Sequence, residues 1–591
     1  VRPGIFVYDM GQNMVGVPEI TLKGIKAGQE INLRYAEVKY PDLPRYAGNE
    51  GMIMLENIRA AMAQDKYITK GGNETIAPRF TYHGYRFIEI TGIDKALPLE
   101  DVKGVVLSSI DGLASKYETS NEKVNQLWHN IVWSTYANFF SIPTDCPQRN
   151  ERLGWAGDIS VFSRTATYLA DVPQFLRRYL CAMRDVQRED GRFPDVAPLG
   201  GGFGGLLWGS AGITVPWEVY QQYGDKSLLA EHYEAMCRYV DYVRTRNINP
   251  ETGILEQEKV WGNLGDWLGP EDNKNDKTLM WEAYFLYDLD IMKKVAQILG
   301  KVEDAEKFAK LYEERKVFFN RTYIDPQTAK TISSGANGPE KGKLVDIQTS
   351  YVLPLSFGIV NPEWKEQFAA NLAHTVQREN VADDGKTYPA YSLMTGFIGT
   401  AWISKALSDN GYDEVAYNLL QQTTYPSWLY SVEQGATTIW ERLNSYTHVD
   451  GFGENNRMNS FNHYSFGAVG AWMYAYSLGI MRDENHPGFK HFVLCPKVDP
   501  TGKMTFARGY YDSLCGRIES AWEVKGGEVR YSFTVPANTS ATLYLPAASM
   551  DSVTENGRAL QAGKEGIKEV TYQDGMCKAE LLSGTYHFVV K

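Results

Sequence analysis

Hydrophobic and polar residues alternate at both ends of the chain. The alternation runs from Ile31 to Tyr35 near the N-terminus and from Val529 to Val535 near the C-terminus. A period of two is typical of a β-strand with one buried face. We therefore predict an antiparallel β-sandwich over residues 1–112 and a second one over residues 484–591.

Between these two regions the hydrophobic positions recur at helical spacing. Thr119 and Glu122 have the spacing of a capping box, which predicts the start of the first helix near residue 119. Further helices are expected around Leu229–Val243, Trp281–Leu299, Asp304–Tyr323, Pro362–Gln377 and Ala401–Asn410. So many helices must close on themselves to bury their apolar faces. We therefore predict a toroid of helical hairpins over residues 113–483.

Two apolar stretches need separate interpretation. Val196–Trp217 is the longest uncharged run, but its many glycines and two prolines favour an irregular loop over a membrane-spanning helix. Phe466–Met481 is shorter and flanked by polar residues, so it is predicted to be a buried helix of the bundle. Neither stretch is predicted to cross a membrane.

Composition adds an acidic charge and many aromatic side chains. Lys and Arg number 60 against 72 Asp and Glu, which gives a net charge of −12. A surface of this sign repels a phosphate backbone, so no nucleic-acid partner is expected. The 14 Trp, 37 Tyr and 24 Phe supply core mass and flat surfaces with one polar edge, which is a weak indication of sugar ligands.

The N-terminus and the cysteines give little information on compartment. The chain starts at Val1 without a basic region or an apolar leader, so its start does not identify where the protein resides, and a bacterial periplasm or secretion is slightly favoured over the cytoplasm. None of the six cysteines forms a CxxC pair. Neither a disulfide scaffold nor a structural zinc site is expected.

The densest group of chemically active residues is Asp145–Asp158. It combines three carboxylates, two guanidiniums and an indole in a turn between two helical patterns. Catalytic groups often lie on such turns. The simpler interpretation is a loop held together by Asp–Arg pairs.

A second group is Thr437–Arg442, where Trp440 and Glu441 stand next to an arginine. Two carboxyl groups on facing loops are what glycoside hydrolysis requires, one protonated and one ionised. Asn462–Tyr464 contains His463, although a lone histidine is more often structural. Gly262–Trp267 and Trp208 add a further acid, Asp266, and further indoles.

Other reaction classes lack their signatures. The sequence contains no HExxH, GxSxG, Walker or dinucleotide-binding motif. The glycines of Gly200–Gly205 have no basic neighbour that could neutralise a phosphate. No cofactor is implied and no metal site is predicted.

At these residues the sequence resembles the bacterial α-L-rhamnosidases of glycoside hydrolase family 78. The segment Asp145–Asp158, DCPQRNERLGWAGD, is similar to the family's long signature. Ala436–Arg442 and Ser460–Trp472 match further family segments in the same order, and Asp9–Gly16 and Phe80–Ile90 resemble its N-terminal β-sandwich.

The resemblance implies an (α/α)6 barrel flanked by β-sandwiches and the hydrolysis of terminal α-L-rhamnosyl residues with inversion. By this resemblance Glu151 is the general acid and Glu441 the base that activates water, with their carboxyl groups about 6.5–9.5 Å apart. The implied substrate-binding residues are Asp145, Arg149, Trp155, Asp158, Trp208, Asp266, Trp267, Trp440 and His463.

The substrate would be a rhamnosylated oligosaccharide, polysaccharide or glycoside, with no membrane partner and a homodimer left open. Two alternatives remain: another inverting glycosidase on the same fold, or a carbohydrate-binding protein without catalysis. Release of rhamnose from an aryl α-L-rhamnoside distinguishes a rhamnosidase from another inverting glycosidase. Loss of rate in Glu151→Gln and Glu441→Gln distinguishes an enzyme from a carbohydrate-binding protein without catalysis.

Overall fold

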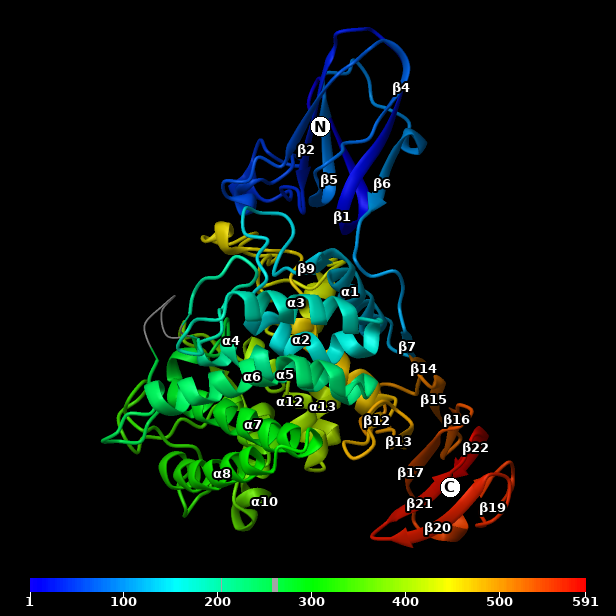
Figure 1. The fold of residues 1–591 in the computed structure, drawn as a ribbon. Helices are drawn as coiled ribbons and strands as arrows, with labels where there is room; N and C mark the ends of the chain where they lie inside the picture. Colours follow the sequence, from blue (N-terminus) through cyan, green and yellow to red (C-terminus); the bar gives the residue numbers. More distant parts are fainter. Residues whose placement is uncertain (204, 258–263) are drawn as a thin grey trace. The chain divides into compact units, whose positions relative to one another are not determined.

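The computed structural model describes residues 1–203, 205–257 and 264–591 (Figure 1). The described chain forms two compact units, each built from segments that are distant in sequence. The first unit contains residues 1–111, 126–155 and 428–467, and the second contains residues 112–125, 156–427 and 468–591. These units cut across the three domains predicted at 1–112, 113–483 and 484–591, whose boundaries stay predictions.

The first unit contains a six-stranded antiparallel sheet in the order β3-β2-β5-β1-β4, with β6 paired to β1. Ile31, Leu33 and Tyr35 of β2 are fully buried, so the predicted strand is confirmed. The strands are β1 (Ile5–Ile25), β2 (Glu30–Ala36), β3 (Gln64–Ile68), β4 (Gly72–Ile76), β5 (His83–Thr91) and β6 (Val102–Val106).

Strand β1 connects this sheet to the remainder of the first unit. Its pairing with β5 is irregular between Asp9 and Met14, and Asn13 lies in this bulge. The Nδ2 atom of Asn13 donates to the carbonyl of Phe461 at 3.2 Å. The segment 428–467 is also held by α1 (Glu122–Asn138), because Ser134 Oγ accepts from the Ile439 amide at 2.8 Å. This unit also contains β8 (Phe139–Phe140), β9 (Ile142–Pro143), α14 (Trp428–Glu433) and the short helices η1 (Pro44–Tyr46), η2 (Glu56–Ile58), η3 (Leu99–Asp101) and η6 (Asn456–Met458).

The second unit contains most of the helices, and they form antiparallel neighbours such as α7 and α8 (Figure 1). Every amphipathic helix predicted from the hydrophobic spacing is present, and its ends lie within a few residues of the predicted ones. The helices are α2 (Ala156–Leu169), α3 (Pro173–Asp185), α4 (Leu206–Gly209), α5 (Ala211–Tyr223), α6 (Lys226–Tyr242), α7 (Lys277–Ile298), α8 (Val302–Tyr323), α9 (Gln348–Ser356), α10 (Pro362–Gln377), α11 (Phe397–Thr400), α12 (Ile403–Asp409), α13 (Asp413–Leu420) and α15 (Gly470–Trp472).

Three local predictions are wrong. The stretch 196–217 is not an irregular loop throughout, because α4 and the start of α5 occupy its second half; full burial of this apolar segment outweighs the cost of Pro216 inside α5. Phe466–Met481 is not one helix. It divides into a 3₁₀ segment, α15, a π turn and β12 (Ile480–Arg482), with Gly479 at a φ of 72° before the strand.

The third correction concerns the start of α1. Thr119 ends strand β7 (Ser115–Thr119) and pairs with Ala507, so it is not the cap. Asn121 caps the helix instead, because its Oδ1 accepts from the amide of Lys123 at 3.1 Å. Asparagine is as strong an N-cap as threonine, and its position allows the strand to run to its full length.

The C-terminal part of the second unit contains two sheets. One has the order β12-β13-β17-β21-β20 and the other β19-β18-β22-β16-β15-β14-β7. Strands β13 and β17 pair in parallel, so the prediction of purely antiparallel sheets is wrong for this pair. The strands are β13 (His491–Leu494), β14 (Phe506–Ser513), β15 (Gly516–Lys525), β16 (Glu528–Val535), β17 (Ser540–Pro546), β18 (Val553–Glu555), β19 (Arg558–Ala559), β20 (Ile567–Gln573), β21 (Met576–Leu581) and β22 (Gly584–Val590).

Two chain-wide expectations can be compared with the structure. All six cysteines are free thiols, as expected for a chain without a disulfide scaffold. Among the described residues, none of the helices has both the length and the apolar content that crossing a bilayer demands.

Candidate active site

The loop that follows β9 carries most of the predicted site and is closed by its own backbone. The Asp145 amide donates to the Leu153 carbonyl at 2.9 Å, and the Leu153 amide donates to Asp145 Oδ1 at 2.8 Å. Arg152 has a φ of 52°, and its Nε donates to the Pro147 carbonyl at 2.7 Å. Strand β5 approaches closely here, because a Cβ on Gly84 would lie 2.8 Å from the Pro147 ring. The loop is therefore fixed before any ligand binds.

Arg149 lies at the centre of this loop, and its side chain is only 2% exposed. Its guanidinium contacts Glu151 at 3.0 Å, Glu441 at 3.1 Å and Asp145 at 3.8 Å. Nη1 also donates to the Met458 carbonyl at 3.3 Å. The structure thus brings the two predicted catalytic acids, from segments almost 300 positions apart in the sequence, onto one buried cation.

Glu151 is bound by three side chains. Its Oε2 accepts from Arg149 Nε at 3.0 Å and from Arg59 Nη1 at 2.9 Å. Its Oε1 accepts from the indole Nε1 of Trp155 at 2.9 Å. The Glu151 side chain is 17% exposed, so it keeps access to solvent. Its carboxyl group is therefore fixed in orientation by donors on both oxygens.

Glu441 lies in a more enclosed environment. Its side chain is 4% exposed and its amide donates to the Ser460 carbonyl at 2.9 Å. Its Oε2 forms an ion pair with Arg149 Nη1 at 3.1 Å. Burial raises the pKa of Glu441, and the charge of Arg149 opposes this shift.

Asp145 and His463 complete the polar shell around Arg149. Burial and the neighbouring Glu151 carboxylate raise the pKa of Asp145 to about 7, although Arg149 acts in the opposite direction. Burial, followed by the charge of Arg149, lowers the pKa of His463 well below its usual range. His463 is therefore a neutral imidazole near neutral pH, and its amide donates to the Ile439 carbonyl at 2.8 Å.

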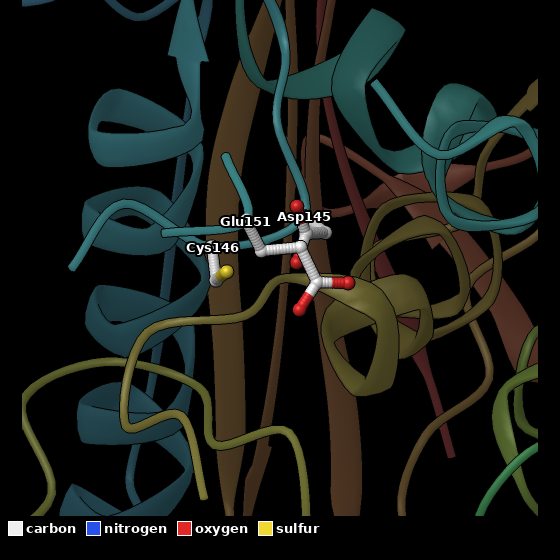
Figure 2. A group of neighbouring side chains, drawn as sticks. All are labelled: Asp145, Cys146 and Glu151. Atoms are coloured by element: carbon white, nitrogen blue, oxygen red, sulfur yellow. The ribbon is translucent and has the colours of Figure 1, made fainter. Parts of the chain in front are cut away.

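Asp145, Cys146 and Glu151 have the donor atoms of a metal site, with one ligand atom of each within 4.8 Å of the others (Figure 2). A dication would have to lie beside the Arg149 guanidinium, which already contacts both carboxylates. Burial and the adjacent Asp145 also raise the pKa of the Cys146 thiol well above its ordinary value, whereas a metal needs the thiolate. These residues therefore fit a cluster balanced by arginine better than a metal site.

Trp440 contacts a different part of the first unit from Glu441. It is 5% exposed and packs edge-on against Phe461, with ring centroids 5.1 Å apart. It lines a cavity of about 430 Å³ together with Glu37 and Phe452. Glu441 thus contacts Arg149 while the neighbouring Trp440 lines this cavity.

Asp158 and Trp208 belong to the second unit, where they lie close together. Asp158 is in the first turn of α2 and is 3% exposed. The indole of Trp208 covers Gly157, because a Cβ built there would lie 2.4 Å from its Cε2 atom. Both positions remain predictions as sugar contacts.

Asp266 and Trp267 also belong to the second unit and differ in exposure. The Asp266 carboxylate accepts from Thr349 Oγ1 and from the amides of Gly396 at 2.7 Å and Gly399 at 2.9 Å. Burial raises the pKa of Asp266 to about 6. Trp267 is 36% exposed and offers an open indole. Gly262 and Asn263 of this predicted segment, like Gly204 of the glycine-rich stretch, lie outside the described residues.

Sequence reasoning missed two residues of the first unit that contact the site or support it. Arg59 donates to Glu151, and Glu37 accepts from Asn13, Asn57 and the Phe461 amide at 2.9–3.0 Å. Burial raises the pKa of Glu37 to about 7. Neither lies in a motif that the sequence analysis singled out.

Profiles of bacterial α-L-rhamnosidase domains match nearly the whole chain. The concanavalin-like domain matches residues 1–108, the 6 hairpin glycosidase domain residues 113–477 and the C-terminal domain residues 479–559.

Relatives with the name α-L-rhamnosidase agree with these profiles. An α-L-rhamnosidase of Streptomyces avermitilis is 37% identical over 100% of this chain and 52% of its own length. One of Formosa agariphila is 34% identical over 99% of this chain and 60% of its own. The chain thus spans about half the length of these relatives.

Solved structures are similar over the same extent. The crystal structure of the Streptomyces avermitilis enzyme complexed with L-rhamnose has a TM-score of 0.87 at 36% identity, covering 100% of this chain and 52% of that one. The α-L-rhamnosidase of Dictyoglumus thermophilum has a TM-score of 0.86 at 32% identity, covering 100% and 62%. With a matching profile over more than half of its residues, the chain belongs to the bacterial α-L-rhamnosidase family.

Proposed function

We propose that this chain hydrolyses terminal non-reducing α-L-rhamnosyl residues with inversion, and that its helices form an (α/α)6 barrel. Membership of the family and the names of its relatives support the activity. The 6 hairpin domain description and the antiparallel helix pairs support the barrel. The substrates we propose are rhamnosylated oligosaccharides, polysaccharides or glycosides.

The observation that carries the proposal is the contact of Glu151 and Glu441 with one guanidinium, that of Arg149. Two carboxyl groups held by a common cation have a fixed separation, which acid–base hydrolysis needs. Glu151 is the more exposed of the two and would protonate the leaving oxygen. Glu441 would take a proton from the attacking water, and its raised pKa would make it a stronger base once ionised.

The remaining residues of the first unit suit a deoxy sugar. Asp145 and Arg149 offer charged partners for hydroxyl groups, and Trp155 offers an indole face beside Glu151. Rhamnose has hydroxyl groups and one methyl group, so it needs both kinds of surface. The rhamnose complex of the Streptomyces avermitilis relative supports this sugar.

Four residues of the second unit are also proposed to bind sugar. They are Asp158, Trp208, Asp266 and Trp267, and their polar and aromatic side chains have the same two chemistries. The exposed indole of Trp267 is the most accessible of them.

The test uses Glu151→Gln and Glu441→Gln with an aryl α-L-rhamnoside. Each variant should lose at least about 10²-fold in kcat while still binding rhamnose, because the amide keeps the shape of the side chain but cannot exchange the proton. A wild-type protein that hydrolyses a different α-linked glycoside and not the rhamnoside would favour another glycosidase. Binding of rhamnose without any turnover would favour a carbohydrate-binding protein.

A further inference from the structure

Arg59 lies outside every motif, yet it contacts the proposed general acid. It belongs to the sheet-bearing N-terminal segment, directly after η2. Its Nη1 donates to Glu151 Oε2 at 2.9 Å, and its Nε donates to the Arg457 carbonyl at 2.9 Å. Its side chain is 23% exposed, which reduces the screening of this ion pair by water.

The backbone around Arg59 is held in a conformation that an arginine rarely adopts. Its φ is 58° and its ψ is −117°. A non-glycine residue in this region costs free energy and persists only where its surroundings impose it, as is frequent at functional sites.

Side-chain hydrogen bonds hold the turn before Arg59 in place. Asn57 donates to Glu37 Oε2 at 2.9 Å, and Glu56 accepts from Asn456 Nδ2 at 2.9 Å. Glu37 also accepts from the Phe461 amide at 3.0 Å. The turn before Arg59 is thus bound to Asn456 directly and to Phe461 through Glu37, and Arg59 has little freedom to leave Glu151.

Arg59 and Arg149 differ in what they neutralise. Arg149 contacts Asp145, Glu151 and Glu441, so its charge is shared among three carboxyl groups. Arg59 forms its ion pair with Glu151. A cation next to a carboxyl group favours its ionised form, whereas a general acid must begin the reaction protonated. The charge of Arg59 also lowers the pKa of Glu441, but its ion pair is with Glu151, the proposed proton donor.

We infer that Arg59 is a positioning residue for Glu151, supplied by the N-terminal segment, and that its charge sets the alkaline limit of hydrolysis. This inference rests on the proposed function. The planar fork orients the Glu151 carboxyl group, and its positive charge lies 2.9 Å from Glu151 Oε2.

Two variants separate the orientation from the charge. In Arg59→Gln we expect kcat/KM to fall by about 10- to 100-fold, the size of a lost charge-assisted hydrogen bond, and the alkaline limb of its pH profile to move up by about one pH unit. In Arg59→Lys the charge stays while the fork is lost. Its kcat/KM should also fall, while the alkaline limb of its pH profile should stay within about 0.3 pH unit of the wild type.

A spectroscopic readout makes the test independent of turnover. The indole N–H of Trp155 donates to Glu151, so its ¹⁵N signal reports the protonation of that carboxyl group. The signal is assigned as the one absent from Trp155→Phe. Its titration midpoint should rise in Arg59→Gln and stay in place in Arg59→Lys.

Arg45→Gln is the matched control. Arg45 is an exposed arginine of the same N-terminal segment that donates to the Asp450 carbonyl rather than to an acid. Its removal should leave both the pH profile and the Trp155 midpoint unchanged. If Arg59→Gln does not fold by circular dichroism, Arg59→Met, which keeps the apolar stem, takes its place.

The inference is overturned if the Arg59→Gln profile and Trp155 midpoint superimpose on those of the wild type. It is also overturned if Arg59→Lys moves them as far as Arg59→Gln does. A wild-type protein that does not hydrolyse the rhamnoside would refute the proposed function alone, because the Trp155 titration would still report whether Arg59 acts on Glu151.

Discussion

Replacing Arg149 by methionine tests how the site tolerates its buried acids. The guanidinium is 2% exposed and compensates Asp145 and Glu441, whose side chains are 2% and 4% exposed. Methionine keeps much of the volume and removes the charge. We expect the variant to fold less stably, by an amount that depends on pH.

The magnitude follows from the burial of the partners. Removing one member of a buried ion pair typically costs about 3–5 kcal/mol, because the other charge is left without compensation. For a unit of this size such a loss lowers the Tm by about 6–20 °C. The contribution of the lost hydrogen bond to the Met458 carbonyl is smaller, about 1 kcal/mol.

The pH dependence has a definite sign. Arg149 opposes the burial that raises the pKa values of Asp145 and Glu441, so its removal raises both further. A group whose pKa is raised on folding stabilises the protein below its unfolded pKa and loses that contribution as pH rises through the folded pKa. The variant should therefore differ less from the wild type at pH 5 than at pH 8, because protonation of the buried acids removes the charges that Arg149 compensates.

The assay is thermal unfolding of the wild type, Arg149→Met and Arg149→Lys at pH 5, 6.5 and 8. Lysine keeps the charge and should recover most of the stability at pH 8, while kcat/KM stays low because the fork is absent. A Tm difference for Arg149→Met that is the same at pH 5 and pH 8 would refute the reasoning.

Three further predictions concern single contacts. Glu37→Gln should lower the Tm more at pH 5 than at pH 8. The pKa of Glu37 is raised to about 7, so the wild type loses stability as pH rises through that value while the variant does not, and thermal unfolding at both pH values tests this. Trp155→Phe should lower kcat/KM by about tenfold with little change in KM, because it removes the donor to Glu151 and keeps the ring; steady-state kinetics check this. Gly157→Ala should cost at least about 1–3 kcal/mol in denaturant unfolding, since its methyl group would meet the buried Trp208 ring.

The site could be predicted in large part because its residues lie in two dense motifs. Asp145, Arg149, Glu151 and Trp155 come from one loop, and Glu441 comes from a second segment that the same chemistry singles out. A cluster of acids, bases and indoles in a turn indicates chemistry even without knowledge of the fold. Once these two segments lie next to each other in the fold, both acids contact Arg149.

Other features could not be predicted, because they depend on contacts made by the folded chain. Arg59 comes from an unremarkable segment and reaches Glu151 only through the turn that Glu37 and Asn57 hold. Trp440 is next to Glu441 in sequence, yet it lines a cavity with Glu37 and Phe452 that Glu441 does not line.

Two local sequence patterns predicted structures that the folded chain does not adopt. Thr119 has the spacing of a capping box but is used by strand β7, which leaves the cap to Asn121. The apolar pattern of Phe466–Met481 predicts a continuous helix, but the segment is broken and ends in β12. Propensity and periodicity are weak where a neighbouring sheet offers backbone partners.

The most direct test of the central claim is the anomer that is released first. The wild-type protein is mixed with an aryl α-L-rhamnoside, and the anomeric proton of free rhamnose is followed by NMR before mutarotation. With Glu151 as acid and Glu441 as the base that activates water, β-L-rhamnose should appear first and the α anomer only later. Initial release of α-L-rhamnose would mean retention and would contradict the account.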